Sequence, residues 1–334
     1  MVNLLLVVHY GELMKNLIIL GTLIFTLSRP CLAEDLFGEF QSNFSTTNLV
    51  QEVPNLKNYK VIILRGLFNN YFSNLSGLLT NLGAPIQDRK YAPFTRESDY
   101  LNSIGIETII PPLDTQGNPA ENGEVLAKII KASDKPVIIL AHSKGGVDAL
   151  YGLTSHPEIQ KKVAGWINYQ VPFYGTKLCD YLIGNEITKA PLKHLLVGIM
   201  GGQWSSMTSL SDRNMKAFHQ KNQEKVKNLV KNIPIISLAS TFDVKTPFEE
   251  ILLPLEERSA FSLLNRTLLD LGEGPNDGFT AVPSACLKGS ECLVLSNIDH
   301  ASLVVDLEPF HTFDKPIRIK IILSLLKMID ARLR

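Results

Sequence analysis

Residues 136–151 read PVIILAHSKGGVDALY, an apolar run that leads through small residues into a helical pattern. The run 137–140 is typical of a strand that is buried on both faces, as in a parallel sheet. Val147, Leu150 and Tyr151 then recur at helical spacing. The stretch therefore predicts a strand, a sharp turn and a helix, with Ser143 at the turn.

Small residues flank Ser143 where a tight strand-to-helix turn needs them. Ala141 and Gly145 let one stretch of backbone pass close to another, and the turn would lift the hydroxyl of Ser143 out of the sheet. The first amides of the new helix would lie beside it without a helical partner. The pattern Ala141-x-Ser143-x-Gly145 resembles the nucleophile elbow of the α/β-hydrolases. A serine in an ordinary strand-to-helix turn is the alternative.

Composition limits the classes of function. The chain has 334 residues, a hydrophobic fraction of 45%, and 33 basic against 33 acidic side chains. A balanced charge gives no sign of a nucleic-acid partner or of an anionic membrane partner. We expect one hydrolase domain over residues 34–334, with no cofactor and no metal.

The N-terminus has the features of an export signal. Lys15 precedes an apolar segment at 17–27, and a small-x-small end at Cys31-Leu32-Ala33 precedes Glu34. We expect residues 1–33 to be this signal, cleaved near Ala33, which would place the mature protein in the periplasm or outside the cell. A start at Met14 and an uncleaved membrane anchor are the alternatives.

Export would place the remaining cysteines in an oxidising compartment. Cys286 and Cys292 flank a turn-like stretch and could close a small disulfide loop, which leaves Cys179 unpaired. No pair of cysteines or histidines has the spacing of a zinc site.

Strand and helix patterns alternate along the chain. Buried-strand runs occupy residues 60–64, 106–110, 163–171, 233–238 and 293–295, in addition to 137–140. Helical patterns end near 104, occupy 118–132, follow Ser143 and close the chain at 317–333, while 34–58 has an irregular, polar pattern. This alternation predicts a mostly parallel sheet with helices on both faces.

Residues 177–232 interrupt that rhythm. Ser211 is a candidate cap for a long helix from 212 to about 231, after an apolar segment at 192–200. We interpret 177–232 as a helical cap or lid above the active-site edge, which would make transient contact with a lipid interface. Extra core-packing helix is the alternative.

The candidate catalytic residues follow the chain order of the α/β-hydrolases: nucleophile, acid, histidine. Serine needs a base, and the base needs an acid to orient it. His300 follows the last predicted strand and is preferred to His311 as the base. Asp277, in a Pro-Asn-Asp-Gly run, is the preferred acid, and Asp243, just past the 233–238 strand, is the alternative.

Three patches together resemble the secreted triacylglycerol lipases of the Pseudomonas and Burkholderia type. They are the elbow at 141–146, the run Gly274-Pro275-Asn276-Asp277-Gly278, and Asp299-His300. The resemblance implies that Asp277 and His300 complete a triad with Ser143. Residues 172–176 are also similar to that family's Pro-x-x-Gly-Ser stretch.

The sequence departs from this family at three positions. Arg65 stands where the family has histidine, and Lys144 follows the serine where the family has an apolar residue or glutamine. Ser302 replaces the aspartate that binds calcium in the family, so a neutral hydroxyl stands in place of a carboxylate. The charged side chain of Lys144 would either face solvent or favour an anionic head group.

The sequence predicts an exported serine hydrolase that cleaves carboxylic esters of lipids or other acyl groups. The backbone amides of Leu67, after the strand at 60–64, and of Lys144 would bind the oxyanion, with Phe68 as a second candidate donor. The alternatives are a phospholipase or acyltransferase on the same triad, and an inactive hydrolase fold that only binds.

Overall fold

The structure is a computed structural model that describes residues 32–49, 54–67, 92–184, 204–243, 259, 261–305, 313 and 315–333. The expected export signal lies outside these residues, apart from the first residues of the helix that begins at Leu32. His311 and Phe68 also lie outside them.

Six parallel strands form one sheet in the order β2-β1-β3-β4-β5-β6. Their bounds are β1 Lys60–Leu64, β2 Glu107–Ile109, β3 Val137–His142, β4 Val163–Tyr169, β5 Ile235–Thr241 and β6 Glu291–Ser296. Every residue of β3 is buried, because helices cover both faces of the central strands. The predicted parallel sheet is confirmed.

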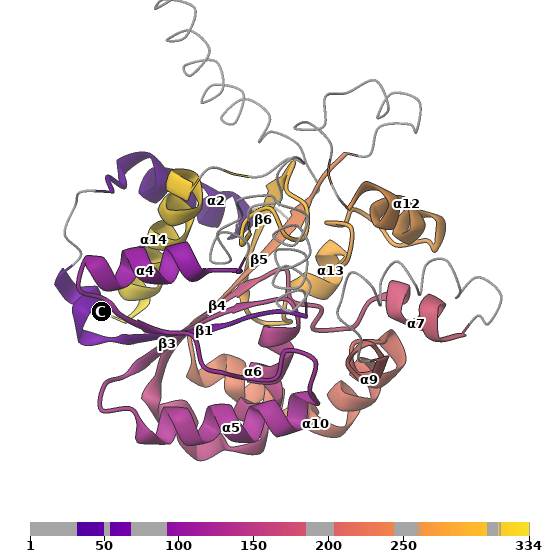
Figure 1. Cartoon of the computed structure of the whole chain (residues 1–334), viewed down its shortest axis with the longest axis horizontal. Helices are drawn as coiled ribbons and strands as arrows, with labels where there is room; N and C mark the ends of the chain where they lie inside the picture. The colour runs from indigo at the N-terminus through magenta and orange to yellow at the C-terminus, as the bar shows by residue number, and fades with distance from the viewer. Residues whose placement is uncertain are drawn as a thin grey trace, which may run out of the picture.

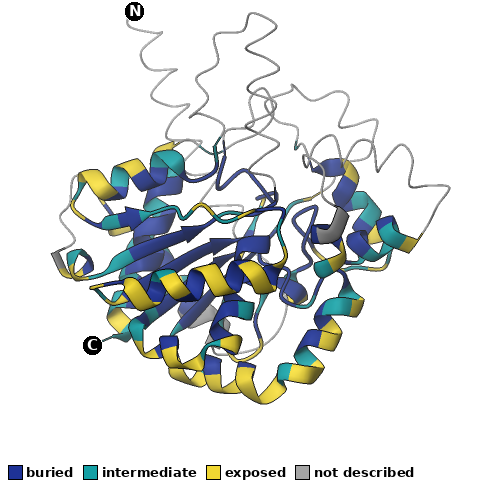
Figure 2. Ribbon diagram, turned by 60° about the horizontal axis from the view of Figure 1, so that its bottom comes forward, coloured by how far each residue is buried: buried dark blue, intermediate teal, exposed yellow. Residues whose placement is uncertain are grey.

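Helices cover both faces of this sheet (Figure 1). On one face lie α5 (Pro119–Ala132), α6 (Lys144–Ser155) and α10 (Asp212–Asn232), and on the other lie α2 (Leu32–Thr46), α4 (Thr95–Ser103) and α14 (Lys315–Arg332). Figure 2 shows the buried strands between helices whose outer faces are exposed. Among the described helices, none combines the length and apolar character needed to cross a bilayer.

Short elements complete the described chain. They are η1 (Pro54–Asn58), η3 (Pro157–Lys162), α7 (Lys177–Gly184), α9 (Trp204–Ser209), α12 (Ser262–Asp270) and α13 (Val282–Ala285). Helices α7, α9, α12 and α13 lie beyond the carboxyl ends of the strands (Figure 1). In an open parallel sheet this edge is where active sites form.

The start of the described chain corrects one prediction. Residues 34–58 are not an irregular lead-in, because most of them form α2 and η1. Leu36 and Phe40 are buried and Phe44 is half-buried, which gives α2 an apolar stripe at a spacing of four residues. Polar residues between these positions hid the stripe. The stripe lets α2 pack against α14 and β6.

The closing helix α14 is buried more completely than an amphipathic surface helix. It contacts α2, α4, β4 and β5, and Arg318 on it is 2% exposed. Arg318 Nε lies 2.9 Å from Glu97 Oε1 on α4, so this charge enters the core as half of an ion pair. Near its end, Arg332 binds Glu39 of α2 and Glu291 of β6.

The predicted helix at 212–231 is confirmed as α10. Ser211 caps it, since the Ser211 hydroxyl accepts a hydrogen bond from the amide of Asn214. Its buried face, with Phe218 and Leu229, packs against α6 and η3, as a sheet-covering helix does. The apolar segment 192–200 lies outside the described residues, and the lid role of 177–232 stays a prediction.

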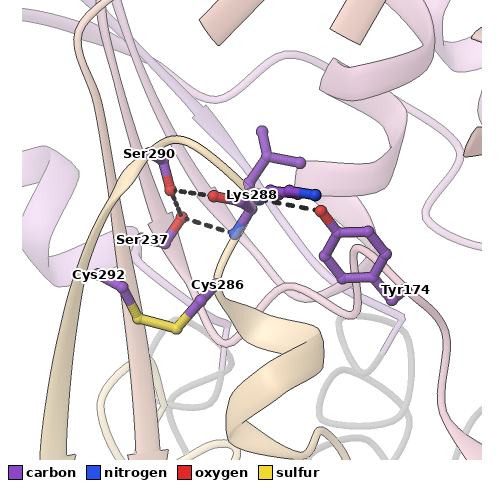
Figure 3. Close-up of a disulfide and its surroundings, with 7 residues drawn as sticks. Tyr174, Ser237, Cys286, Lys288, Ser290 and Cys292 are labelled. Atoms are coloured by element: carbon purple, nitrogen blue, oxygen red, sulfur yellow. Dashed lines mark hydrogen bonds between the residues drawn. A yellow bond between two sulfur atoms is a disulfide. The ribbon is translucent and has the colours of Figure 1, made fainter. Parts of the chain in front are cut away.

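Cys286 and Cys292 form a disulfide across a short turn between α13 and β6 (Figure 3). Hydrogen bonds tie this turn to β5 and to the segment after β4. The hydroxyl of Ser290 lies 2.9 Å from that of Ser237 on β5, and the amide of Lys288 donates to the Tyr174 hydroxyl at 2.9 Å. Cys179 is buried and unpaired with any other cysteine of the described chain. The pairing that the sequence left open is therefore present.

Helices α5 and α6 touch backbone to backbone. A Cβ atom on Gly123 would lie 2.7 Å from the amide nitrogen of Gly152, closer than real contacts allow. A Cβ atom on Gly38 in α2, by contrast, would have no atom within 4 Å. The two glycines therefore differ in what a methyl group would meet.

We expect Gly123→Ala to lower the free energy of unfolding by about 1–3 kcal/mol, because the helices must move apart. Gly38→Ala should raise it by about 0.5–1 kcal/mol, because alanine leaves the unfolded chain less conformational freedom than glycine does and is the better helix former. Urea unfolding of both variants checks this pair. Equal shifts in the same direction would contradict the close contact.

Candidate active site

The nucleophile elbow lies between β3 and α6. Ser143 has φ 52° and ψ −129°, a strained conformation for a residue with a side chain. The amide of Ser143 donates to the carbonyl of Tyr169 on β4 at 2.9 Å, which ties the turn to the next strand. The sharp turn that the sequence predicts is confirmed, with the serine hydroxyl at the carboxyl edge of the sheet.

His300 stands directly beside Ser143. Its Nε2 lies 2.8 Å from Ser143 Oγ, and both residues are fully buried. The chain reaches this point because β6 ends at Ser296 and a short turn follows it. The structure thus brings together the first two predicted residues over a distance at which a proton can pass.

Asp277 lies on the other side of the imidazole. Its Oδ2 is 2.8 Å from His300 Nδ1, and its Oδ1 accepts the amides of Phe279 at 2.8 Å and Thr280 at 2.6 Å. The carboxylate is fully buried, so these donors replace the water that it would otherwise bind. Its fixed position makes His300 Nδ1 the protonated nitrogen and leaves Nε2 to accept from Ser143.

The structure separates the two candidate acids. Asp243 follows the end of β5 and is exposed, whereas Asp277 contacts His300. Asp299 has a different role: its Oδ1 accepts the amides of Ala301 and Ser302 and so shapes the turn after His300.

The loop after β1 passes against the elbow. A Cβ atom on Gly66 would lie 2.8 Å from Ser143 Cβ, so only glycine fits there without a shift. Leu67 follows and is 2% exposed, and Lys144 is the first residue of α6, where backbone amides have no helical partner. The two predicted oxyanion donors therefore belong to segments that flank Ser143.

Arg65 anchors this loop from the side. Its Nε donates to the carbonyl of Pro93 and its Nη2 to the hydroxyl of Thr95, each at 2.7 Å. Burial lowers the pKa of the guanidinium, which still stays charged in proteins. The residue that departs from the lipase pattern thus binds the segment that leads into α4.

The side chain of Lys144 corrects both sequence interpretations. It is fully buried and therefore faces neither solvent nor a substrate head group. Its Nζ lies 2.7 Å from Asp148 Oδ1 on the next turn of α6, and Asn122 Nδ2 of α5 donates to Asp148 Oδ2 at 2.8 Å. Burial raises the pKa of Asp148 to about 6, against the opposing effect of Lys144.

The loop that carries Asp277 is pinned to the end of β4. The hydroxyl of Thr280 donates to the carbonyl of Gln170 at 3.2 Å, and the hydroxyl of Ser284 donates to the carbonyl of Gly175 at 2.6 Å. The amide of Phe173 donates to the carbonyl of Ser284 at 3.0 Å. The 172–176 segment therefore supports the acid loop, a role that its sequence did not indicate.

Ser302 does not supply the carboxylate that binds calcium in the lipases that the sequence resembles. Ser302 is fully buried and supplies a neutral hydroxyl, whereas calcium takes six to eight oxygen ligands, several of them carboxylates. In the described part of the chain, no three His, Cys, Asp or Glu side chains gather in a way that could hold a metal ion.

Hydrogen-bonded serine, histidine and aspartate side chains at the carboxyl edge of a parallel sheet are the arrangement found in serine hydrolases. The strand order, the strained turn at Ser143 and the histidine after the last strand together give the chain the α/β-hydrolase fold.

Comparison with solved structures shows the same fold in known proteins. The chain is similar to the mature form of the lipase BlEst2 of Bacillus licheniformis, with a TM-score of 0.54 and 19% identity over 82% of this chain and 91% of that one. It is also similar to the metagenomic carboxyl esterase MGS0156, with a TM-score of 0.58 and 15% identity over 82% of this chain and 76% of that one.

At these identities the likeness concerns the fold, which confirms the predicted α/β-hydrolase architecture. No model of a known protein family matches the sequence, and no curated protein matches it as a relative. The narrower resemblance to the Pseudomonas and Burkholderia lipases stays a prediction.

We expect the contribution of Asp148 to stability to fall as the pH rises from about 4 to about 6. A carboxyl group whose pKa is higher in the folded state stabilises fully below its unfolded pKa and loses this effect as the pH passes its folded pKa. The shift from 3.8 to about 6 corresponds to about 3 kcal/mol.

Urea unfolding of the wild type and of Asp148→Asn across that pH window measures this effect. The variant cannot ionise at this position, so the unfolding free energy of the wild type minus that of the variant should decrease as the pH rises. A difference that stays constant would show that Asp148 has the same pKa in the folded and the unfolded chain.

Proposed function

We propose that this protein is an exported serine hydrolase that cleaves carboxylic esters of lipids or other acyl groups. The observation that carries the proposal is the buried chain of contacts from Ser143 Oγ through His300 to Asp277, with both links at 2.8 Å. The fold shared with a lipase and a carboxyl esterase supports the same reaction class.

The proposed mechanism begins with attack of Ser143 Oγ on the ester carbonyl carbon. His300 Nε2 takes the hydroxyl proton, and Asp277 stabilises the imidazolium and holds its orientation. The negative charge that develops on the carbonyl oxygen would be bound by the amides of Leu67 and Lys144. These amides need no charged side chain, which agrees with the burial of the Lys144 side chain against Asp148.

Acylation ends when the bond between the carbonyl carbon and the alcohol oxygen breaks. His300 gives its proton to the leaving alcohol, which departs and leaves Ser143 acylated. In the second half of the cycle water attacks the acyl carbon while His300 removes its proton, and the tetrahedral intermediate then collapses to release the acid as His300 returns the proton to Ser143 Oγ. An alcohol in place of this water would make the same site an acyltransferase.

Export is supported by the Cys286–Cys292 disulfide, since structural disulfides persist mainly in oxidising compartments. Cleavage near Ala33 would leave the mature chain beginning close to the start of α2, whose stripe packs on α14 and β6. Mass spectrometry of the protein recovered from the periplasm or culture medium identifies its first residue.

We expect a fluorophosphonate probe to label the wild-type protein at Ser143 and to leave Ser143→Ala unlabelled. Hydrolysis of p-nitrophenyl esters should fall in that variant by about 10⁶-fold in kcat. Peptide mapping locates the label, and a series of acyl chain lengths reports the preferred acid. A folded wild type that neither labels nor hydrolyses would support an inactive, binding role instead.

Replacing each candidate acid separately tests the third member. Asp277→Asn should lower kcat by about 10³- to 10⁴-fold, because the amide no longer fixes the tautomer of His300. Asp243→Asn is the matched control and should retain wild-type turnover, because Asp243 is exposed and His300 is held by Asp277. Loss of turnover in Asp243→Asn alone would overturn the assignment of the acid.

A further inference from the structure

The backbone around His300 is held more firmly than its side-chain contacts alone require. The peptide group between Asp299 and His300 is bound at both ends: its N–H donates to the carbonyl of Asp277 at 2.8 Å, and its carbonyl accepts from Gln170 Nε2 at 2.7 Å. The next carbonyl, that of His300 itself, lies 2.7 Å from His142 Nε2. Three hydrogen bonds therefore fix the two peptide groups that carry the imidazole.

His142 precedes the nucleophile and is 2% exposed. A carbonyl oxygen can only accept, so the bond to His300 requires the proton of His142 to be on Nε2. Burial and the neighbouring His300 lower the pKa of His142 to about 3, so its ring stays neutral and keeps this single N–H. Its ring centroid lies 4.9 Å from that of His300, which brings the two side chains into contact.

The ring of His142 also meets the loop after β1. A Cβ atom on Gly66 would lie 3.1 Å from His142 Nδ1, and the ring of Phe94 is packed edge-on with a centroid distance of 6.3 Å. The side chain is therefore wedged between the loop of the proposed oxyanion donor and the backbone of His300. It has little room to release the carbonyl that it binds.

Gln170 comes directly after β4 and is fully buried. Its φ of 54° is unusual for a residue with a side chain, and such strain persists where the surroundings hold it in place. Its amide donates to the carbonyl of Leu238 on β5 at 2.7 Å, and its side-chain nitrogen also lies 2.5 Å from Ser240 Oγ. Gln170 thus connects β4, β5 and the turn that carries His300.

We propose that His142 and Gln170 are positioning residues that hold the backbone on both sides of His300 and so set its imidazole between Ser143 and Asp277. Each side chain binds a backbone carbonyl next to the imidazole, so each acts through His300. This role rests on the proposed hydrolase function and adds two residues to it.

Three substitutions separate the hydrogen bonds from the shape of these side chains. His142→Phe keeps a ring and removes the donor, while His142→Gln places an amide nitrogen near the position of Nε2 and restores it. Gln170→Met approximates the shape of glutamine without its N–H groups, and both residues are equally strained at a positive φ. His156→Phe is the matched control, because His156 pairs with Glu124 at the far end of α6.

The measurements are kcat and KM for a soluble p-nitrophenyl ester, with active sites counted by fluorophosphonate titration and folding followed by thermal melting. His142→Phe and Gln170→Met should each lower kcat by about 10- to 100-fold, the effect of a small misplacement of the base. Their KM should stay within about 2-fold of wild type, because no substrate contact is lost. His142→Gln should recover kcat to within about 3-fold of wild type, and His156→Phe should have the kcat of the wild type.

Wild-type kcat per labelled site in both His142→Phe and Gln170→Met would overturn the inference, as would a loss in kcat that His142→Gln fails to recover. Should melting show His142→Phe to be unfolded, a wild-type kcat per labelled site in Gln170→Met alone overturns the inference. A wild-type chain that never labels at Ser143 would instead overturn the proposed function, so the two failures give different results.

Discussion

The imidazole of His300 must lie at hydrogen-bonding distance from two side chains that the chain supplies from separate elements. Ser143 comes from the turn after β3, and Asp277 comes from the loop before α13. Both contacts are short and buried, so a small rotation of the ring would break one of them and leave a buried polar group unpaired. Much of the described structure at this edge acts to prevent that rotation.

The sheet provides the first part of this restraint. In a parallel sheet the carboxyl ends of all strands meet at one edge, and here β1, β3, β4, β5 and β6 each deliver a segment to it. The amide of Ser143 is bound to β4, the acid loop is bound to the segment after β4, and the histidine turn is bound to Gln170 at the end of the same strand. The end of β4 is therefore the common support for nucleophile, acid and base.

The sequence was informative where one local pattern carries one structural meaning. Apolar runs predicted all six strands of the described sheet, Ser211 predicted the start of α10, and the turn at Ser143 followed from its small neighbours.

The same reasoning failed for α2. Its stripe of Leu36, Phe40 and Phe44 is diluted by polar residues, and the helix is held by contacts with a helix at the other end of the chain. It also failed for Lys144, because only the fold shows that its charge is buried against Asp148, which also accepts a hydrogen bond from Asn122 of α5. Gln170 belongs to no motif, and its partners lie about seventy and about one hundred and thirty residues further along the chain, so no window of sequence contains the signal.

The His142 ring connects the loop after β1 with the turn that carries His300. One side of the ring faces Gly66, and the other faces the carbonyl of His300. A substitution that shifts residues 65–67, the described part of the loop after β1, would therefore be felt at the histidine turn through the His142 ring. Effects of changes in the two loops should be epistatic rather than additive, since residues that share a packed neighbour couple energetically. Libraries that vary the two loops one at a time would miss combinations that the site tolerates only together.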